Sequence, residues 1–430
     1  MTKRWLIAVA ALVAVVSLVG GLVAAVRAST VRSAGAPEIS VPGTPAPTPA
    51  PPTTGRSPRP TPHGAGPAAD TTHVDDRYRA RYAGRYVGWD ELLAAGQKLP
   101  KKTAGCRSDW RATSRDTALN WTKAGYLCLD QLTGNGFKPQ GIAGSGATHG
   151  YRIGRRPAAD RNVVLVSSYS SKQEKGPLFP HRPGETETTR LTVIDLDRGV
   201  YRQVELVRPD GVNAFTALDS HGSGFVWVGQ YMYSSSRGSL WMYNADDLME
   251  IDGRYVLPAV ARWGVKGAGG FSSIGLDRST TPTTLTAINY TQTGTAWSQS
   301  FDLDAAGRIQ NGTRKPRDDL TLTSDFGPGP ATIGSTRSVV VQGTNFQGIG
   351  TSGKYRFVNS SSLLVDGRRH GDNVVVLKRG KTIARFAMPS ENVESIYLDF
   401  RRDRYLTVTE HGRQFLFWLP LNHLIDRAER

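Results

Sequence analysis

The chain has 430 residues, of which 21% are charged, and a formal net charge of +16 at pH 7. That length suffices for one large domain or two ordinary ones with well-formed cores. Its 37 aromatic residues and 47 glycines, without long amphipathic helical patterns, favour many strands joined by tight turns and argue against an all-helical fold.

Residues 1–28 have the pattern of a signal peptide or a membrane anchor. Lys3 and Arg4 precede an uncharged run from Trp5 to Val26 that is long enough to cross a bilayer, and Val26-Arg27-Ala28 offers a small-residue cleavage pattern. A cleaved signal peptide and an uncleaved transmembrane helix both remain open. In either case the basic N-terminus stays inside, so we expect an extracytoplasmic protein, secreted or anchored by its N-terminal helix.

Residues 29–75 are predicted to be a disordered linker. Between Ala34 and Thr72 the chain is mostly Pro, Thr, Ala and Gly, with almost no large apolar side chain. Such a segment cannot bury enough surface to offset the entropy lost on ordering, and its prolines favour extended conformations. It suits a spacer that carries a domain away from a membrane or through a cell wall, or a tail that serves only solubility.

Residues 76–136 are predicted to form a short N-terminal cap on the main domain. A short helix is expected within 77–99, with Trp89, Leu92 and Leu93 on one side and Asp90 in its first turn.

The cap contains both cysteines of the chain, Cys106 and Cys128. In an exported protein two cysteines at this spacing predict one disulfide. Two thiols alone do not make a metal site, and the segment lacks the histidine that a catalytic cysteine would use.

Residues 137–430 contain a short motif that recurs, most clearly as Gln140-Gly141-Ile142 and Gln347-Gly348-Ile349. Each copy precedes a strongly β-forming run, and repeats at this spacing are typical of a β-propeller. The predicted first strands are 140–143, 214–219, 271–276, 347–350 and 393–399, and the second strands are 163–169, 225–232, 284–290, 354–359 and 404–410. The predicted fourth strands are 201–207, 254–264, a poorly defined segment near 308–313, and 381–387.

The fold class predicted is therefore all-β, a β-propeller of five blades, with six as the alternative if residues 318–343 form a blade of their own. The fifth repeat lacks a last strand, and a closed propeller commonly borrows one from the other end of the domain. Tyr126–Leu129 and Val339–Gln342 are the two candidates for that strand. Three predicted third strands also end alike, in an acid that would cap the following turn: Ile194-Asp195-Leu196-Asp197, Met242-Tyr243-Asn244-Ala245-Asp246 and Phe301-Asp302-Leu303-Asp304.

Three stretches of residues 137–419 resemble secreted bacterial β-propellers of the NHL, YncE-like and gluconolactonase (SMP-30) type. They are Pro139-Gln140-Gly141-Ile142-Ala143, the Val-Leu-Val-Ser-Ser-Tyr run ending at Tyr169, and the Leu-Thr-Val-Ile-Asp-Leu-Asp strand ending at Asp197. The resemblance implies a fold more than an activity. Calcium-dependent lactonases of that group use an acidic and amide cluster around a central metal, and no residue-by-residue counterpart of that cluster is found in this sequence.

Strand ends at equivalent positions are expected to meet around the mouth of a central channel. Tyrosines and amides in such a ring suit the recognition of a sugar or a peptide. Each of these residues could instead serve packing or bond a loop backbone. The predicted ligand-binding residues are Gln140, Tyr169, Asn213, Tyr231, Tyr290, Gln347 and Asn359. The titratable members of the ring, and so the candidate catalytic residues, are Glu394, Glu410 and His411.

The remaining histidines show no metal-ligand spacing and are interpreted as loop or surface residues: His149, His181, His221, His370 and His423. The favoured function is a binding protein, not an enzyme, that takes a carbohydrate or protein ligand at the channel mouth. The alternative is an extracytoplasmic hydrolase or lyase that depends on calcium. The net charge also favours anionic envelope polymers as partners, whereas no recognition helix for nucleic acid is visible, and membrane contact is expected only through the N-terminal segment.

Overall fold

The computed structural model describes residues 81–430, except 114–118, 122–123, 135, 171–178, 211–213, 237, 267–269, 292–294, 311–320, 327–331, 336, 343–344, 362–363, 366–367, 370–371 and 390–391. Internal contacts divide the chain into two compact units, residues 1–56 and 57–430, and all described residues belong to the second. The predicted signal or anchor segment and the whole of the predicted linker lie outside the described residues. Among the residues that are described, no helix has the length and apolar character needed to cross a membrane.

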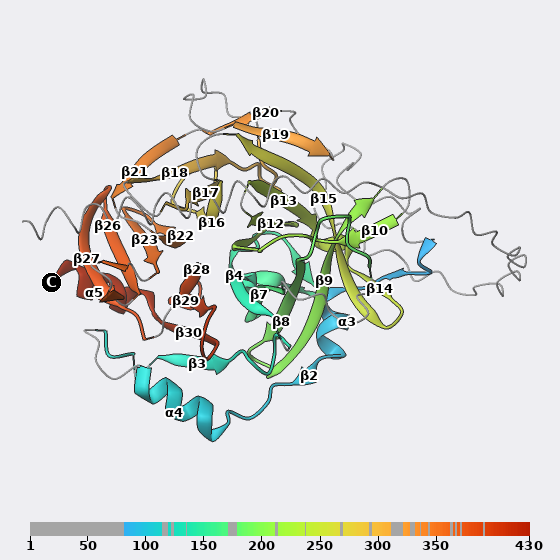
Figure 1. The fold of residues 1–430 in the computed structure, drawn as a ribbon, viewed down its shortest axis with the longest axis horizontal. Helices are drawn as coiled ribbons and strands as arrows, with labels where there is room; N and C mark the ends of the chain where they lie inside the picture. The colour runs from blue at the N-terminus through green and yellow to red at the C-terminus, as the bar shows by residue number, and fades with distance from the viewer. Residues whose placement is uncertain are drawn as a thin grey trace, which may run out of the picture. The chain divides into compact units, whose positions relative to one another are not determined.

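Antiparallel ladders of four strands recur five times among the described residues (Figure 1). Ladder 1 is β4 (Lys138–Gly144), β7 (Val163–Ser170), β8 (Thr188–Asp195) and β9 (Val200–Asp210). Ladder 2 is β11 (Gly224–Val228), β12 (Tyr231–Ser236), β13 (Ser239–Asn244) and β15 (Arg254–Lys266).

Ladder 3 is β16 (Phe271–Asp277), β17 (Thr284–Asn289), β18 (Thr295–Asp302) and β21 (Arg337–Gln342). Ladder 4 is β22 (Phe346–Ser352), β23 (Tyr355–Ser360), β26 (Asn373–Lys378) and β27 (Lys381–Ala387). Ladder 5 is β28 (Val393–Asp399), β29 (Arg404–Thr409), β30 (Phe415–Pro420) and β3 (Gly125–Cys128).

The first strands of the ladders contact one another in a cycle, β4 to β11 to β16 to β22 to β28 and back to β4. This arrangement is β-propeller-like, and it confirms the predicted all-β class. The cycle also explains the glycines of the repeated motif. A Cβ on Gly141 would lie 2.7 Å from the carbonyl oxygen of Gly222, and one on Gly348 would lie 2.6 Å from that of Glu394. At these two positions a side chain would collide with the backbone of the neighbouring segment, so glycine is required.

Strand β3 comes from the N-terminal side of the domain and completes ladder 5, because Gly125–Cys128 pairs with β30. It is one of the two candidates that the sequence offered, whereas the other, Val339–Gln342, lies in β21 of ladder 3. The predicted disulfide between Cys106 and Cys128 is present, with the two Cα atoms 6.3 Å apart. It links β3 to helix α4 (Ala104–Thr113), whose Trp110 packs against Phe415 and Phe417 of β30.

Residues near the start of the described chain pack on ladders 1 and 2. The predicted helix is α3 (Trp89–Ala94), with Trp89, Leu92 and Leu93 buried and Asp90 in its first turn, as expected. Strand β1 (Arg85–Tyr86) pairs with β14 (Met249–Ile251), and β2 (Gln97–Lys98) pairs with β9. The chain ends in α5 (Leu421–Glu429).

The shorter elements lie between or beside the ladder strands. They are η3 (Ser145–Ala147), β5 (Arg152–Ile153), β6 (Arg156–Pro157), η4 (Ala158–Asp160), β10 (Ala214–Ala217), η5 (Ala245–Asp247), β19 (Thr321–Phe326), β20 (Thr332–Gly334), β24 (Leu364–Val365) and β25 (Arg368–Arg369).

Three strand predictions are wrong. The segment predicted as the first strand of the second repeat contains β10, which pairs with β9. The segment 225–232, predicted as one second strand, is divided between β11, the first strand of ladder 2, and the start of β12. The fourth strand of ladder 3 is β21, whereas Ile309, in the segment predicted for it, makes only an isolated bridge to Leu303.

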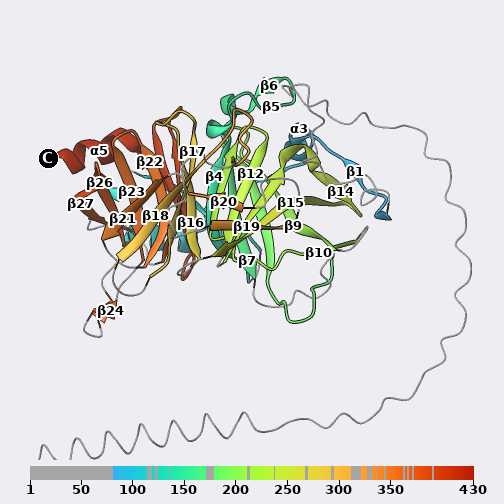
Figure 2. The same cartoon turned by 90° about the horizontal axis from the view of Figure 1, so that it is seen from above.

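The ladders have two ends, which we name by chain direction. At the start face the first strands begin and the second strands end; Lys138 of β4 is opposite Tyr169 of β7 there. At the turn face the first strands end and turn into the second strands. In Figure 2, β5, β6 and α3 lie along the upper edge, at the turn face, and β24 lies along the lower edge, at the start face.

Candidate functional site

Tyr169 is the centre of a polar network at the start face. Its hydroxyl donates a hydrogen bond to Glu410 Oε1 over 2.9 Å, and Lys138 Nζ lies 3.6 Å from the same carboxylate oxygen. Its ring stacks on the imidazole of His221, with centroids 4.0 Å apart and planes at 18°. His221 Nδ1 in turn lies 2.7 Å from Glu187 Oε2. We call these five residues the start-face network, and they join ladders 1 and 5 to the segment before β11.

The network includes two of the predicted residues, Tyr169 and Glu410, and His411 lies at its edge with its Nε2 3.2 Å from Glu410 Oε2. The sequence interpretation of His221 as a loop or surface residue misses its contacts, since nothing in its spacing signals a partner in Glu187. Burial raises the pKa of the Tyr169 hydroxyl, and the Glu410 carboxylate raises it further. The hydroxyl therefore remains protonated at neutral pH and keeps donating its hydrogen bond.

Glu394 lies deeper, in β28, and its side chain is fully buried. Neither carboxylate oxygen has a hydrogen-bond partner among the described residues. Burial raises the pKa of Glu394 well above its ordinary value, and the charges of Glu410 and Asp372 act in the same direction. A carboxyl group in this setting is protonated at neutral pH, because the buried anion would have neither water nor a donor.

Glu394 shares its position with residues of three other first strands. The pairing between first and second strand is interrupted near the start face in ladders 1, 3, 4 and 5. The residues in the interruptions are Gln140, Ser272, Gln347 and the Glu394-Ser395 pair. Such β-bulges re-aim side chains and occur often beside functional sites. Two of the predicted amides, Gln140 and Gln347, therefore occupy equivalent positions around the cycle of first strands.

The other predicted residues are dispersed. Asn359 is buried, and its Nδ2 donates to the Glu394 backbone oxygen at 2.6 Å and to Thr407 Oγ1 at 2.9 Å, so it has a packing role. Tyr290 is exposed just after β17. Tyr231 begins β12 and is buried at the turn face, so its predicted place in the ring is wrong. Asn213 lies outside the described residues.

The axis between the first strands is filled. Ser273 of ladder 3 and Ser395 of ladder 5 lie with their hydroxyl oxygens 3.4 Å apart. Closer to the turn face a small void of about 20 Å³ is lined by side chains that include Trp227, Leu276 and Ile396. A ligand at the start face would therefore rest on the mouth and would not enter a channel. Among the described residues, no three His, Cys, Asp or Glu side chains gather closely enough to hold a metal ion.

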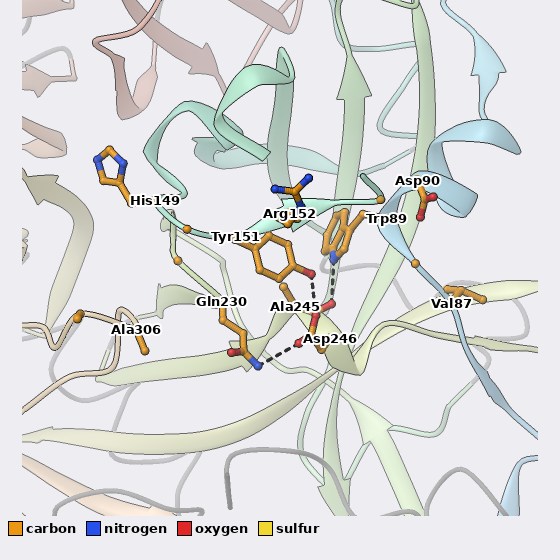
Figure 3. Close-up of a pocket in the computed structure, with 15 residues that line it drawn as sticks. Val87, Trp89, Asp90, His149, Tyr151, Arg152, Gln230, Ala245, Asp246 and Ala306 are labelled. Carbon is orange, nitrogen blue, oxygen red and sulfur yellow. Dashed lines mark hydrogen bonds between the residues drawn. The ribbon is translucent and has the colours of Figure 1, made fainter. Parts of the chain in front are cut away.

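A pocket of about 280 Å³ lies at the turn face, and no sequence pattern predicted it. Figure 3 shows Tyr151 and Gln230 pointing toward Asp246 in this pocket. The Tyr151 hydroxyl donates to Asp246 Oδ1 at 2.9 Å, and Gln230 Nε2 donates to Asp246 Oδ2 at 3.1 Å. Trp89 forms one wall, where its Nε1 donates to the carbonyl oxygen of Ala245 at 2.8 Å. His149, interpreted from the sequence as a loop residue, lies at the rim.

Comparison with known proteins adds little to this geometry. No family model matches the chain, and no curated protein matches it in sequence. Among solved structures, the crystal structure of Chaetomium thermophilum Raptor is similar over 74% of this chain at 11% identity and a TM-score of 0.33. The match covers 30% of the Raptor chain, so this chain spans less than a third of that protein. A likeness at this level carries no argument about fold or function.

Proposed function

We propose that the protein is an exported five-bladed β-propeller that binds a carbohydrate on the mouth at its start face. In this proposal each ladder is one blade, and β3 closes the ring by completing ladder 5. The cyclic contacts of the first strands support this blade count over six. The resemblance to NHL, YncE-like and SMP-30 propellers agrees with this architecture and stays a prediction.

The start-face network is the observation that carries the proposal. It presents the carboxylates of Glu187 and Glu410 beside the ring of Tyr169, and it is rich in hydrogen-bond acceptors. A ligand that matches such a surface supplies many hydrogen-bond donors together with a flat apolar face. A sugar has both of these features. Solvent reaches this part of the start face mainly at Lys138, whose side chain is 38% exposed, and at His411 beside the network, whose side chain is 47% exposed, whereas Glu187 and Glu410 are 11% and 12% exposed.

The place of action in the proposal is the cell envelope or the outside of the cell. The basic and apolar N-terminal segment would export the chain and, where it is not cleaved, anchor it. The net charge of +16 would attract anionic envelope polymers without specific contacts. Such attraction weakens as salt is added, whereas the binding of a neutral sugar at the start face does not depend on salt in this way.

The proposal is tested by calorimetric titration of the purified full chain with cell-wall glycans and oligosaccharides. Tyr169→Phe removes one hydroxyl and Glu410→Gln removes the charge that it contacts, so each should weaken binding about tenfold or more. Tyr355→Phe is the matched control, since the Tyr355 hydroxyl also donates to a carboxylate, that of Glu429, but far along the chain on ladder 4. Equal affinity in all three variants would refute the start-face site. If no glycan binds and the chain instead binds a protein in a pull-down, the ligand is a protein and the carbohydrate proposal is wrong.

The alternative, a calcium-assisted hydrolase or lyase, rests on the electrostatic coupling of Glu394 to Glu410. The described residues provide no group of three ligating side chains to support it. The same titrations repeated with calcium and with a chelator separate the two functions. Thermal stabilisation by calcium that Glu410→Gln abolishes would favour the enzyme.

A further inference from the structure

The pocket at the turn face is built from five segments that are far apart in the sequence. They are the start of α3, residues 149–154, the β11–β12 turn at Gly229 and Gln230, η5, and residues 305–306. The backbone fixes two of these walls against each other: Gly229 has φ +55°, and a Cβ there would collide with the carbonyl oxygen of Ala306. The pocket is thus a packed feature of the fold, separate from the start-face network, which lies at the opposite ends of the same strands.

Asp246 departs from the pattern set by the other turn acids. The Asp195 side chain accepts hydrogen bonds from the backbone amides of Asp197 and Arg198, and Asp304 likewise accepts from backbone amides of its turn. At η5 it is Asn244 that caps the turn, accepting from the Asp246 backbone nitrogen at 3.0 Å. The Asp246 carboxylate is turned instead toward Tyr151 and Gln230 (Figure 3).

The polar groups that reach the pocket are mostly acceptors held in fixed positions. Gln230 Nε2 is engaged by Asn244 Oδ1 and Asp246 Oδ2, at 3.2 and 3.1 Å, which leaves its Oε1 as an acceptor with no donor among the described residues. Each oxygen of the Asp246 carboxylate receives a donor from Tyr151 or Gln230, and a carboxylate oxygen can accept more than one hydrogen bond. Burial, with the Asp246 charge, raises the pKa of the Tyr151 hydroxyl well above its ordinary value. That hydroxyl therefore stays protonated, and its oxygen can accept one bond from a ligand.

The aromatic wall of the pocket and its volume restrict the kind of ligand that it can bind. The Tyr151 ring packs against the Trp227 ring with centroids 5.8 Å apart, and Trp227 packs against Trp89 with centroids 4.9 Å apart. These contacts hold the aromatic wall of the pocket in a fixed position. The volume of about 280 Å³ is just below the roughly 300–1,000 Å³ of pockets for drug-sized molecules. Only one small ring fits such a space.

The charged side chains that line the pocket are two carboxylates, Asp90 and Asp246, and one guanidinium, Arg152. The two carboxylates would repel an anion, and Arg152 would repel a cation that approached from its side. Burial lowers the pKa of His149, and nearby Arg278 lowers it further, so this rim imidazole is neutral at pH 7. A neutral ligand rich in hydroxyl donors satisfies the acceptors without opposing either charge.

We propose that this pocket binds a neutral polyhydroxylated ring about the size of one hexose, with Asp246, Gln230 and Tyr151 accepting its hydroxyls. The site is independent of the start-face site and does not require that the start-face proposal hold. It would give the domain a second sugar contact on the opposite end of the strands, suited to a terminal residue of a glycan.

The test is titration of the full chain with glucose, galactose, mannose and myo-inositol, followed by saturation-transfer NMR and calorimetry. Asp246→Asn should weaken binding of whichever ring binds by about tenfold or more, and Tyr151→Phe should weaken it several-fold. Tyr355→Phe, Tyr169→Phe and Glu410→Gln should leave it unchanged, which separates this site from the start-face site. Circular dichroism confirms folding of each variant. If Asp246→Asn does not fold, the same binding measurements are made on Tyr151→Phe and Gln230→Ala, which should both bind the ring more weakly.

Three results would overturn the proposal. The first is no saturable binding of any of the four rings. The second is binding that survives unchanged in Asp246→Asn and Tyr151→Phe. The third is tighter binding of glucose 6-phosphate or glucosamine than of every neutral ring, since this would assign the pocket to an ion.

Discussion

Replacing Glu394 by Gln tests the electrostatics of the fold by exchanging a single hydroxyl for an amino group. The wild-type side chain is fully buried, and its two oxygens lack partners among the described residues. Protonated Glu and Gln are both neutral and nearly equal in shape, so the variant should fold as the wild type does at low pH. The two proteins should differ only where the wild-type carboxyl group would ionise in the unfolded chain.

The sign of the effect follows from proton linkage. The pKa of Glu394 in the folded state is well above its ordinary value of 4.5, so the folded protein keeps a proton that the unfolded chain releases. Unfolding is then increasingly favoured as the pH rises from about 4.5 to the folded-state pKa. Each pH unit in that window costs the wild type about 1.4 kcal/mol of unfolding free energy, whereas the amide of the Glu394→Gln variant cannot ionise and loses none of it.

The measurement is urea unfolding of the full chain at pH 5, 6 and 7, followed by tryptophan fluorescence. The buried reporters among the described residues are Trp89, Trp110, Trp121, Trp227, Trp241 and Trp263. From pH 5 to pH 7 the wild type should lose about 2–3 kcal/mol more than Glu394→Gln, provided that the folded-state pKa stays above 7. In relative terms the variant should become the more stable protein as the pH rises.

Glu429→Gln is the matched control for this experiment. The pKa of Glu429 is lowered by hydrogen bonds from Lys378 and Tyr355, so its contribution to stability is present above pH 4.5 and is lost only as the pH falls below it. Its removal should leave the slope between pH 5 and pH 7 unchanged. Parallel slopes for wild type and Glu394→Gln would refute the assignment of a buried, neutral Glu394.

Two further changes test the architecture. Replacing Cys106 and Cys128 by Ser should destabilise the domain by about 3 kcal/mol, seen as a lower urea midpoint, because the disulfide ties α4 to the strand that completes ladder 5. An unchanged midpoint would show that β3 stays docked without the link. Gly348→Ala should cost about 1–3 kcal/mol in the same assay, since its Cβ would lie 2.6 Å from the Glu394 carbonyl oxygen. Gly238→Ala, where a Cβ meets nothing within 4 Å, is the neutral control, and equal effects at both glycines would contradict the close packing of first strands.

Local sequence predicted the strands well where each repeat is short and regular. In ladders 4 and 5 the strands lie within a residue or two of the expected positions, because each is an apolar, β-forming run bounded by turn residues. The closing strand β3 was one of two candidates, since the fifth repeat lacked a partner for β30 and the sequence did not decide between them. Ladder 3 was only partly predicted: its fourth strand follows a long segment after β18, and no local pattern indicates which later strand pairs with β18.

Ladder 2 shows why strand pattern does not fix pairing. Phe215-Thr216-Ala217-Leu218 resembles the first strand Phe271-Ser272-Ser273-Ile274, yet it folds back on β9 as β10. Both segments are short, apolar and β-forming, and their partners are set by tertiary packing. The consequence for the site is large, because shifting the ladder by one strand moves Tyr231 from the predicted ring to the turn face.

The pocket at the turn face could not be read from the chain because its residues come from segments that share no pattern. Trp89 was predicted only as the apolar side of a helix, and Asp246 only as a turn acid. The one available signal was Asn244, two residues before Asp246: an Asn at that position can cap the turn by itself, which releases the following acid for another contact.

The bulges at the start face place a small residue and a polar residue side by side in the repeat. The small residue is Gly141, Ser273, Gly348 or Ser395, and first strands meet there, as the 3.4 Å approach of Ser273 to Ser395 shows. The polar residue beside it is Gln, Ser, Gln or Glu, and three of these four side chains are buried, those of Gln140, Ser272 and Glu394. Close packing of the first strands therefore accounts for the glycine of the Gln-Gly-Ile motif but not for its glutamine. A buried polar side chain costs free energy unless it is hydrogen-bonded, as Ser272 is to the carbonyl oxygen of Ile288, so burial alone would favour an apolar residue at this place.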